Sequence, residues 1–508
     1  MSKEPFYVTT PIYYVNDEPH LGHAYTTIVA DVLARYARLQ GRETFFLTGT
    51  DEHGQKVQAA AQRQGVSPQA HADEMVLRFQ GAWDDLNVAY DDFIRTTQPR
   101  HKEVVQEVLS RLWQQGEIYR GAYEGWYCVP DERFWTEKDL MDGACPDCGR
   151  AVERLVEENY FFRMSEYQEW LIETINSHPD FIRPEFRRNE VLGFLRQPLG
   201  DLCISRPISR LSWGIPLPFD EAYVTYVWFD ALLNYASAIG YLRDPQRFQT
   251  FWPHATHLIG KDILITHAVY WPTMLHAAGL APPQTIFAHG WWVVEGTKMS
   301  KSRGNVVRPL ALAQVYGVDA FRYFLIGEMS LRRDSTFSEA GLRQRYQADL
   351  ANDLGNLLHR LTSMIGRYCG GAVPAAGAPG AEEAALRARC EGVASEVFDQ
   401  VADFALNDAL RQIMEVVGEI NRYLERTQPW QRAKAGEAER VATILYTASE
   451  ALRLCSVLLS PVLPERTGEL WRQLGWRPAR SPAEGLRWGA LQPGATVQRG
   501  APLFPRLE

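Results

Sequence analysis

The sequence predicts an α/β protein with a split Rossmann-like parallel sheet, an inserted connective domain and a C-terminal α-helical bundle. Three observations lead to this fold class. Strand and helix patterns alternate near the N-terminus, the alternation stops near residue 118 and returns near residue 224, and helical periodicity replaces it beyond about residue 340.

The composition is that of a large globular protein without a general affinity for polyanions. The chain has 508 residues, of which 46% are hydrophobic and 23% charged, enough for about two to four domains. Its 53 basic and 62 acidic residues give a formal charge of -9, so a polyanionic partner must meet local patches. We see no signal-peptide pattern at residues 1–5 and no uninterrupted apolar run near about 18 residues. We therefore expect a cytoplasmic protein that does not enter membranes.

The first elements predict a βαβ unit. Residues 6–10 are β-branched and aromatic, residues 24–39 have a helical pattern that Gly41 closes, and residues 44–48 form a second strand. The second strand runs into the glycine-containing loop 49–54. We expect this loop at the carboxyl edge of the sheet, where ligands bind in such folds.

The elements after the insertion complete the sheet and then become helical. Residues 223–227 return to a strand pattern, and residues 257–259 and 285–289 are strands with a helical stretch between them. Further on, a seam of apolar residues advances in steps of three and four, as on the buried face of a helix. The seam consists of Leu342, Tyr346, Leu350, Leu354, Leu357, Leu361 and Ile365. A Gly/Ala/Pro loop at 370–380 separates it from amphipathic stretches near Val393 and Arg440.

The segment His20-Leu21-Gly22-His23 lies where the first loop becomes a helix. Backbone N–H groups of the first turn and two imidazoles can face a bound nucleotide there, and Gly22 allows a flat ring or a phosphate to approach closely. Two histidines three residues apart can also bind a metal or merely cap the helix. The motif alone leaves these alternatives open.

The segment Lys298-Met299-Ser300-Lys301-Ser302 places two ammonium groups and two hydroxyls on one loop. Such a loop suits a polyphosphate, although a solvated basic turn is the more common reason for such a stretch. Together, the histidine and lysine motifs bracket the split sheet. In this arrangement they resemble the two signatures of class I aminoacyl-tRNA synthetases.

Over its whole length the chain resembles the methionyl-tRNA synthetases within that class. The resemblance rests on residues 11–16, 51–54, 226–231, 259–262 and 288–290 in addition to the two motifs. It implies that ATP and L-methionine form methionyl-adenylate with Mg²⁺, and that methionine then passes to elongator and initiator tRNA(Met). No general base is needed, because the methionine carboxylate is already a nucleophile and the site has to align it and neutralise charge.

Aromatic residues point to an apolar amino-acid pocket. Trp228, Ala231 and Tyr235 fall at i, i+3 and i+7, so they share a face if this segment is helical. A thioether packs well against aromatic edges, but an aromatic core face gives the same pattern. The resemblance implies a methionine site formed by Ile12, Tyr14, Trp228, Ala231, Tyr235 and His289. It also implies that Asp51 binds the substrate ammonium group, and we suggest Arg206 for the carboxylate.

The resemblance also implies an ATP site. Gly260 and Asp262 would contact adenosine, with the Asp262 carboxylate accepting hydrogen bonds from the ribose. His20, Gly22 and His23 would surround the phosphates, and Lys298 and Lys301 would close over them as charge develops on pyrophosphate.

Three cysteines in the insertion suggest a metal knuckle. Cys145-Pro146-Asp147-Cys148-Gly149 has the form of a zinc knuckle, and Cys128 lies upstream. Asp131 stands where zinc-binding members of the family carry a fourth cysteine. We expect a structural zinc site formed by Cys128, Asp131, Cys145 and Cys148. The insertion would then be a zinc-knuckle connective domain. A water as fourth ligand, or a knuckle without metal, remains possible.

Polar residues beside the leucine seam suggest an RNA contact. Asn352, Asn356 and Arg360 form a stripe on one helix, which on its own is most simply a solvated face. Trp430 follows Pro429 at a helix junction and is most simply a core anchor. The resemblance implies that Asn356, Arg360 and Trp430 read the CAU anticodon by base-edge hydrogen bonds and stacking.

The resemblance implies domain boundaries and leaves alternative functions to test. We expect a catalytic domain at 1–117 and 225–292, the connective insertion at 118–224, a lysine-loop and stem-contact region at 293–345, and a helical anticodon-binding domain at 346–508. The chain carries no appended tRNA-binding module, so we expect a monomer. The rivals are another class I synthetase such as that for cysteine, a catalytically silent tRNA-binding protein, and a nucleotidylyltransferase.

Overall fold

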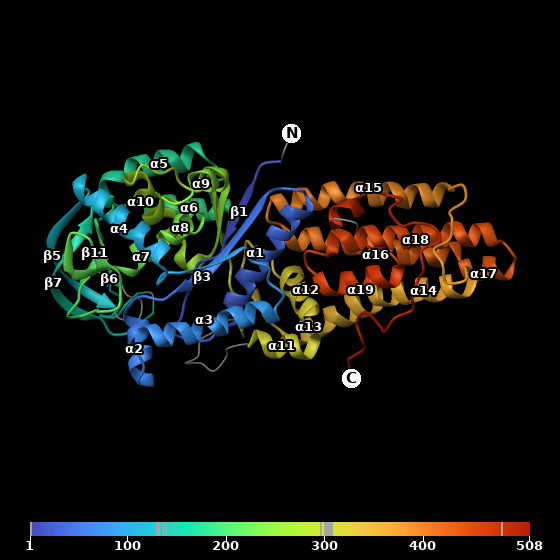
Figure 1. Cartoon of the computed structure of the whole chain (residues 1–508), viewed down its shortest axis with the longest axis horizontal. Coiled ribbons are helices and arrows are strands. Elements are labelled where there is room, and N and C mark those ends of the chain that lie inside the picture. The colour runs from blue at the N-terminus through green and yellow to red at the C-terminus, as the bar shows by residue number, and fades with distance from the viewer. Residues whose placement is uncertain are drawn as a thin grey trace.

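The computed structural model describes residues 3–128, 133–135, 137, 140–146, 148–294, 297–298, 308–478 and 481–507. Its α/β part lies at one end of an elongated molecule and its helical bundle at the other, with α1 (Leu21–Leu39) and α12 (Val318–Glu328) where they meet (Figure 1). The predicted fold class is confirmed.

A seven-stranded parallel sheet forms the centre of the α/β part. Its order is β2-β3-β1-β13-β14-β8, and β4 also pairs with β3. The strands are β1 (Phe6–Thr9), β2 (Tyr13–Tyr14), β3 (Thr44–Asp51), β4 (Asp92–Arg95), β8 (Ile182–Arg183), β13 (Ala255–Gly260) and β14 (Thr285–His289). In the registers, Tyr7 lies opposite Phe45 on one side of β1 and opposite Ala255 on the other. The first and last parts of the sheet therefore meet at β1, as a split sheet requires.

Helices and short turns cover this sheet. Helix α1 begins three residues earlier than expected, because His20 caps it, and it is buried along most of its length. The remaining elements are α2 (Gln55–Gln64), α3 (Pro68–Asp85), α4 (Pro99–Gln114), α7 (Val227–Leu232), α8 (Asn234–Ala238), α9 (Pro245–Phe251), η3 (Trp252–His254), η4 (Lys261–Ile263), η5 (Thr266–Tyr270) and α10 (Trp271–Ala277).

The predicted insertion is built mainly on an antiparallel sheet. Strand β5 (Ile118–Cys128) pairs along its length with β7 (Glu153–Phe162), flanked by β6 (Arg133–Trp135) and β9 (Leu202–Cys203). Further elements are η2 (Met164–Tyr167), α5 (Gln168–Ser177), α6 (Glu185–Phe194), β10 (Ser205–Pro207), β11 (Pro216–Leu217) and β12 (Asp220–Thr225). Strand β8, from the same stretch of sequence, instead joins the central sheet beside β14. Two residues are too short a strand to be recognised by alternation.

The C-terminal part is helical. Helix α13 (Glu339–Arg345), the π-helical segment η7 (Tyr346–Gly355) and α14 (Asn356–Tyr368) follow one another without a loop, and every residue of the predicted apolar seam is buried. The bundle continues with α15 (Ala381–Ala402), α16 (Leu406–Thr427), α17 (Pro429–Lys434), α18 (Ala438–Leu459), α19 (Pro464–Leu474) and η8 (Pro482–Leu486). Between sheet and bundle lie β15 (Trp292–Val294), β16 (Thr297–Lys298), β17 (Ser335–Thr336) and α11 (Pro309–Tyr316).

Helix α18 is the central helix of the bundle. By length and composition it could cross a membrane, but 94% of its most apolar window is buried inside the protein. Its buried charges, Glu450 and Arg453, pair with each other at 2.7 Å. This helix is therefore explained by the bundle core. The same apolar core continues through α12 and α1 to the sheet, so the two parts share one packed interior.

Candidate active site at the carboxyl edge of the sheet

The carboxyl edge of the central sheet brings together predicted site residues from four segments of the chain. Asp51 ends β3, Gly260 ends β13, His289 ends β14, and His20 begins α1. Because β3, β1, β13 and β14 run parallel, their carboxyl ends lie along the same edge.

His20 is the N-cap of α1. Its Nδ1 accepts a hydrogen bond from the Gly22 amide at 3.0 Å, and its own amide donates to His23 Nδ1 at 3.4 Å. The two imidazole rings stack with centroids 3.7 Å apart. The capping interpretation of this motif is thus realised in the structure. A ring whose Nδ1 accepts carries its hydrogen on Nε2, so both rings keep an N–H donor for an anion.

The His23 imidazole is neutral at physiological pH. Burial lowers its pKa well below the ordinary value, and the neighbouring His20 lowers it further. A charged imidazole would have to give up its hydration at this position. The pair can therefore donate hydrogen bonds to phosphate without carrying two positive charges.

Gly22 leaves room for the His20 ring. A Cβ atom at position 22 would lie 3.0 Å from His20 Cε1 and 3.2 Å from His20 Nδ1, so the ring would have to shift by a few tenths of an ångström. The close approach of a ligand at Gly22 stays a prediction, and the structure places the capping imidazole beside this glycine.

The loop after β3 is held by side chains that sequence reasoning did not single out. Glu52 is fully buried, and Arg95 donates to its Oε1 at 2.6 Å and to its Oε2 at 3.0 Å. Thr50 and Thr97 donate to the same carboxylate, and the Trp213 indole donates to the Glu52 carbonyl. Asp51, only 2% exposed, is therefore presented by an anchored backbone.

A second buried carboxylate, that of Asp230, contacts His53 of this loop. Asp230 Oδ2 is 2.6 Å from His53 Nδ1, and Asp230 Oδ1 is 2.7 Å from His101 Nε2. Burial alone would raise the pKa of Asp230, but the two imidazoles hold it at about 2. The motifs at 51–54 and 226–231 were both visible in the sequence, but nothing local indicated that they would meet.

The predicted aromatic face is divided between two short helices. Leu233 separates α7 from α8, so Trp228, Ala231 and Tyr235 do not lie on one continuous helix. Ala231 and Tyr235 are buried and Trp228 is half-buried. The condition of one continuous helix is therefore not met, although Leu233 itself keeps a right-handed helical conformation and the segment is helical on both sides of it.

The Tyr235 side chain is fixed by histidines. Its hydroxyl lies 2.8 Å from His267 Nε2, and its ring stacks on His257 with centroids 4.1 Å apart. His267 Nδ1 lies 2.9 Å from the Ile263 carbonyl, so it carries the hydrogen and Nε2 accepts from tyrosine. Burial lowers the pKa of His267 to about 4, which keeps that ring neutral.

His289 is fixed as a neutral imidazole. Its Nδ1 lies 2.6 Å from the Gly290 carbonyl and its Nε2 lies 2.8 Å from Thr26 Oγ1 on α1. Burial lowers the pKa of His289. The Gly290 carbonyl and Asp262 raise it, but by less. Gly290 is itself required, because a Cβ there would lie 2.3 Å from the Arg333 backbone.

The predicted adenosine residues form a second tight corner. A Cβ at Gly260 would lie 2.5 Å from Asp262 Oδ1, so glycine makes room for this carboxylate. The Trp291 indole donates to the same oxygen at 3.1 Å. Lys261 Nζ pairs with Asp334 at 2.7 Å and lies 4.2 Å from the centroid of the Trp291 ring.

Other predicted residues lie close by or outside the described part. Ile12 and Tyr14 are half-buried, and Tyr14 lies opposite Asp51 in the register of β2 and β3. Lys56 Nζ lies 5.0 Å from the Tyr14 ring centroid. The Lys298 backbone lies in β16, but its side chain, and Lys301 as a whole, lie outside the described residues.

Arg206 is a buried cation. It donates to the Ser205 carbonyl at 2.6 Å and to Cys203 Sγ at 3.2 Å, and its guanidinium lies over the rings of Tyr127 and Tyr226. Burial opposes its charge, but the pKa of Arg206 is still raised, so the side chain stays positive. With Arg210 it lines a small cavity.

The three predicted cysteine ligands come together in the insertion. The Sγ atoms of Cys128, Cys145 and Cys148 all lie within 4.8 Å of one another, with 3.5 Å between those of Cys128 and Cys148. Thiolates bound to one tetrahedral zinc at about 2.3 Å would be about 3.8 Å apart, so the set fits that ion. Asp131 lies outside the described residues.

The predicted anticodon residues lie on α14 and at the start of α17. Helix α17 lies at the end of the bundle far from the sheet (Figure 1). The Arg360 guanidinium lies 5.9 Å from the Trp430 ring centroid and pairs with Glu425 at 2.6 Å. Asn356 is exposed, and Trp430 is half-buried.

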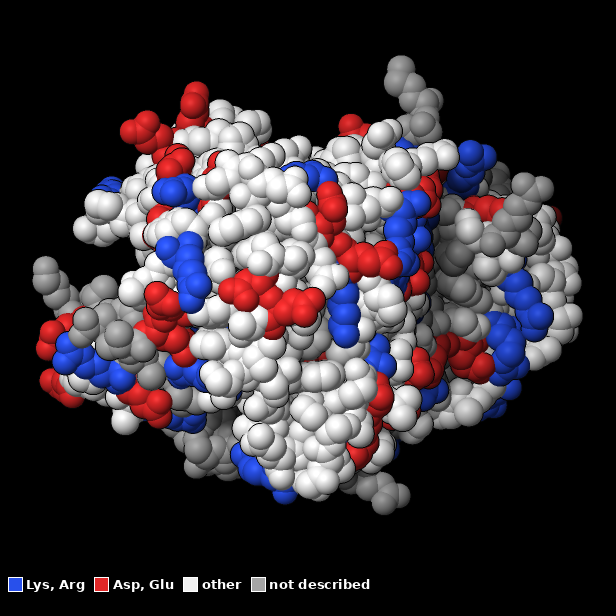
Figure 2. All heavy atoms as spheres, turned by 60° about the vertical axis from the view of Figure 1, so that its left-hand side comes forward, with Lys and Arg blue, Asp and Glu red and all other residues white. Residues whose placement is uncertain are grey.

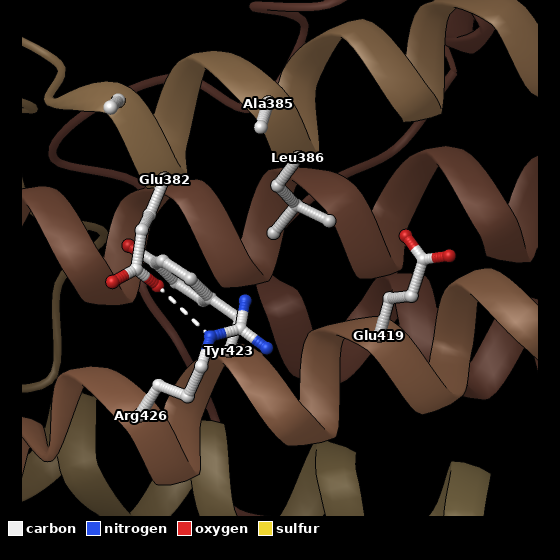
Figure 3. A pocket seen from close by; sticks show the side chains of 7 residues that line it. Glu382, Ala385, Leu386, Glu419, Tyr423 and Arg426 are labelled. Atoms are coloured by element: carbon white, nitrogen blue, oxygen red, sulfur yellow. Dashed lines mark hydrogen bonds and ion pairs between the residues drawn. The ribbon is translucent and has the colours of Figure 1, made fainter.

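A groove between α15 and α16 lies elsewhere in the bundle, lined by Ala381, Glu382, Ala385, Leu386, Glu419, Tyr423 and Arg426 (Figure 3). The Glu382–Arg426 ion pair spans it at 3.2 Å. It contains none of the predicted site residues.

Comparison with known families agrees with the geometry of this site. The family described as tRNA synthetases class I (M) matches residues 6–157 and 152–362, and the anticodon-binding domain of tRNA ligases matches residues 383–484. The chain therefore belongs to the class I tRNA synthetases, and it is an enzyme of that class.

Individual relatives define the family more narrowly. Methionine–tRNA ligase of Caldanaerobacter subterraneus subsp. tengcongensis is 46% identical over 508 residues, covering 100% of this chain and 79% of the relative. That of Streptomyces coelicolor is 46% identical over 522 residues, covering 99% and 97%. The structure of Mycobacterium tuberculosis methionyl-tRNA synthetase in complex with methionyl-adenylate matches with a TM-score of 0.95 at 41% identity, covering 99% of this chain and 100% of that one. Within its class, this chain is a member of the methionyl-tRNA synthetases, as its resemblance predicted.

Proposed function

We propose that the protein activates L-methionine with ATP, releases pyrophosphate and transfers methionine to the terminal ribose of tRNA(Met). The observation that carries this proposal is the meeting, at one sheet edge, of a capped helix with two stacked imidazoles and the buried Asp51 carboxylate. A helix N-terminus suits phosphates, and a buried carboxylate suits an ammonium group.

In the proposed ATP site, the Nε2–H groups of His20 and His23 donate to the phosphates. The Asp262 carboxylate accepts from the ribose, and the close approach at Gly260 sets its position. Lys298 and Lys301 neutralise the charge that develops on the leaving pyrophosphate, together with Mg²⁺. No proton has to be removed from the carboxylate nucleophile, so these residues act by alignment and charge stabilisation.

In the proposed methionine site, Asp51 binds the ammonium group and Arg206 the carboxylate. Ile12, Tyr14, Trp228, Ala231, Tyr235 and His289 surround the thioether side chain. The neutral state of His289 supports this role, because a charged ring would be a poor neighbour for an apolar substrate.

The proposed tRNA contacts are local. On the face drawn in Figure 2, acidic and basic side chains are interspersed among the described residues, in agreement with the net charge of -9. Asn356, Arg360 and Trp430 would bind the CAU anticodon, the Trp430 ring by stacking and the other two by hydrogen bonds. Elongator and initiator tRNA(Met) share this anticodon, so both are proposed substrates.

The remaining assignments are also proposals. Cys128, Cys145 and Cys148, with Asp131 as fourth ligand, would hold one structural zinc that stabilises the knuckle. We further propose a monomer that works in the cytoplasm. Its catalytic halves are 1–117 and 225–292, the connective insertion is 118–224, the lysine-loop region is 293–345 and the anticodon-binding domain is 346–508.

The direct test is exchange of labelled pyrophosphate into ATP without tRNA. Methionine, leucine, isoleucine and cysteine are compared as substrates with Mg²⁺ present. Exchange with methionine alone is expected. Exchange with another amino acid would contradict the pocket assignment, and no exchange in folded protein would favour a silent tRNA-binding protein.

A further inference from the structure

One buried carboxylate joins the segments that surround the proposed methionine site. Asp230 on α7 is 0% exposed and contacts His53 from the loop after β3 and His101 from α4. His101 Nδ1 in turn lies 3.0 Å from Ser237 Oγ on α8. Asp230 therefore joins three segments that are distant in sequence: the loop after β3, α4 and α7.

The two ends of this cluster adjoin different parts of the proposed site. His53 is two residues from Asp51, the proposed ammonium ligand. Asp230 stands between Trp228 and Ala231, which belong to the proposed side-chain pocket. The contact between His53 and Asp230 thus links the loop that carries Asp51 to the helix that carries Trp228 and Ala231.

We propose that Asp230, acting through His53, is a positioning residue that sets the spacing between the ammonium site and the side-chain pocket for methionine. The inference rests on the proposed function of this edge of the sheet. Asp230 itself does not touch substrate, since His53 and His101 occupy its two carboxylate oxygens.

The contacts predict a local effect when Asp230 is changed. The loop 51–54 has a separate anchor, because Glu52 pairs with Arg95. That anchor does not depend on Asp230, so the loop keeps this attachment. Asn at position 230 retains one acceptor oxygen for two histidines, so the tie between α7 and the loop is weakened. A shift of α7 relative to Asp51 should weaken methionine binding more than ATP binding.

The test measures pyrophosphate exchange in the full chain with Asp230→Asn, with methionine and ATP varied separately. We expect the KM for methionine to rise by about tenfold or more, because small misplacements of binding groups have effects of this size or larger. The KM for ATP should change less than about twofold on the same reasoning. Glu450→Gln is the matched control, since Glu450 is an equally buried carboxylate that pairs with Arg453 in the bundle. It should leave both KM values unchanged.

A second pair of variants keeps the test decisive if Asp230→Asn does not fold. His53→Gln retains an N–H donor for Asp230, whereas His53→Leu does not. We expect the KM for methionine to rise in the leucine variant. In the glutamine variant it should stay close to the value of the unmodified protein. Equal behaviour of the two variants, or equal changes in both KM values, would overturn the positioning role. Absence of methionine-dependent exchange in the unmodified protein would instead overturn the proposed function.

Discussion

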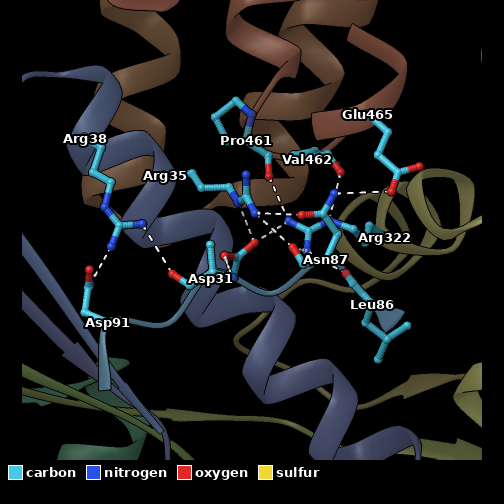
Figure 4. A network of polar contacts seen from close by, with 11 residues as sticks. Asp31, Arg35, Arg38, Leu86, Asn87, Asp91, Arg322, Pro461, Val462 and Glu465 are labelled. Atoms are coloured by element: carbon cyan, nitrogen blue, oxygen red, sulfur yellow. Dashed lines mark hydrogen bonds and ion pairs between the residues drawn. The ribbon is translucent and has the colours of Figure 1, made fainter. Parts of the chain in front are cut away.

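Arg322 of α12 and Asp31 of α1 form a fully buried ion pair of 2.5 Å across the boundary between the sheet and the bundle. The same guanidinium donates to four backbone carbonyls, those of Leu86, Asn87, Pro461 and Val462. Figure 4 shows these groups converging on Arg322 from α1, the loop after α3 and the turn between α18 and α19. One side chain thereby ties the catalytic part to the bundle.

Replacing Arg322 should destabilise the whole protein. In Arg322→Met, Asp31 keeps Arg35 as an ion-pair partner, but four backbone carbonyls lose their hydrogen-bond donor. We therefore expect the free energy of unfolding to fall by about 3–5 kcal/mol, as measured by urea unfolding. Arg38→Ala, which breaks the exposed pair with Asp91, is the control and should cost less than about 1 kcal/mol. Equal losses in the two variants would contradict the junction role.

The stability of the protein should depend on the titration of Asp319. Burial raises the pKa of this carboxyl from 3.8 to about 6. A group whose pKa is raised in the folded state contributes to the free energy of unfolding when it is protonated. This contribution is complete below pH 3.8 and is lost as the pH rises through 6. Asp319→Asn should therefore gain about 2 kcal/mol relative to the unmodified protein between pH 4 and pH 8, since pH 4 already lies just above the unfolded-state pKa. Urea unfolding at both pH values tests this, and a constant difference would refute it.

Substitution of Gly22 should impair ATP use. In Gly22→Ala the new Cβ meets the His20 ring at 3.0 Å, so the cap must shift. We expect kcat/KM for ATP in pyrophosphate exchange to fall by about tenfold or more. Gly81→Ala in α3 is the control, because no heavy atom lies within 4 Å of its Cβ and alanine favours a helix by about 1 kcal/mol. Activity like that of the control would argue against a role for the cap.

The cysteine cluster should bind about one zinc ion per chain, and Cys148→Ser should lose most of it. Metal analysis of the purified protein after dialysis checks both expectations. Cys369→Ser, a half-buried cysteine outside the cluster, should keep the metal. Full zinc content in the Cys148 variant would show that the ion lies elsewhere.

Removal of the Trp430 ring should weaken tRNA charging without affecting methionine activation. Stacking on one base contributes about 1–3 kcal/mol, so Trp430→Ala should raise the KM for tRNA by roughly tenfold to a hundredfold. Pyrophosphate exchange should be unchanged, because α17 lies at the far end of the bundle. Arg367→Ala, at an exposed position of the same helix as Arg360, is the control for general charge loss. A loss of exchange activity would point to a folding defect instead.

The sequence predicted what local patterns encode. The apolar seam from Leu342 to Ile365, the strands around β1 and the cysteine knuckle follow from spacing, and the structure confirms each of these features as a local arrangement. The two-residue strand β8 and the break at Leu233 carry no such pattern. The contact of Asp230 with His53 and His101 was also missed, because 177 and 129 residues separate the partners.

Contacts between distant segments also limit what sequence predicts about the site. The motif at 51–54 can be recognised in the sequence, but the burial of Glu52 against Arg95 depends on β4 lying beside β3. Likewise, the need for glycine at 260 and 290 comes from neighbouring segments that only the fold brings close. Tertiary packing, which no window of sequence contains, decides these positions.

The split sheet also has a consequence for synthesis on the ribosome. Strand β1 needs β13 as a neighbour, and 248 positions separate Thr9 from His257, which lie side by side in that pair. At about 5–20 residues per second, translation takes roughly 12–50 s to cover this interval. Throughout that time the nascent chain presents an open strand edge next to an unfinished core, which is the kind of surface that pairs with other chains. We therefore expect chaperone depletion to lower the yield of folded protein. The loss should arise mainly from chains that aggregate before β13 has been synthesised.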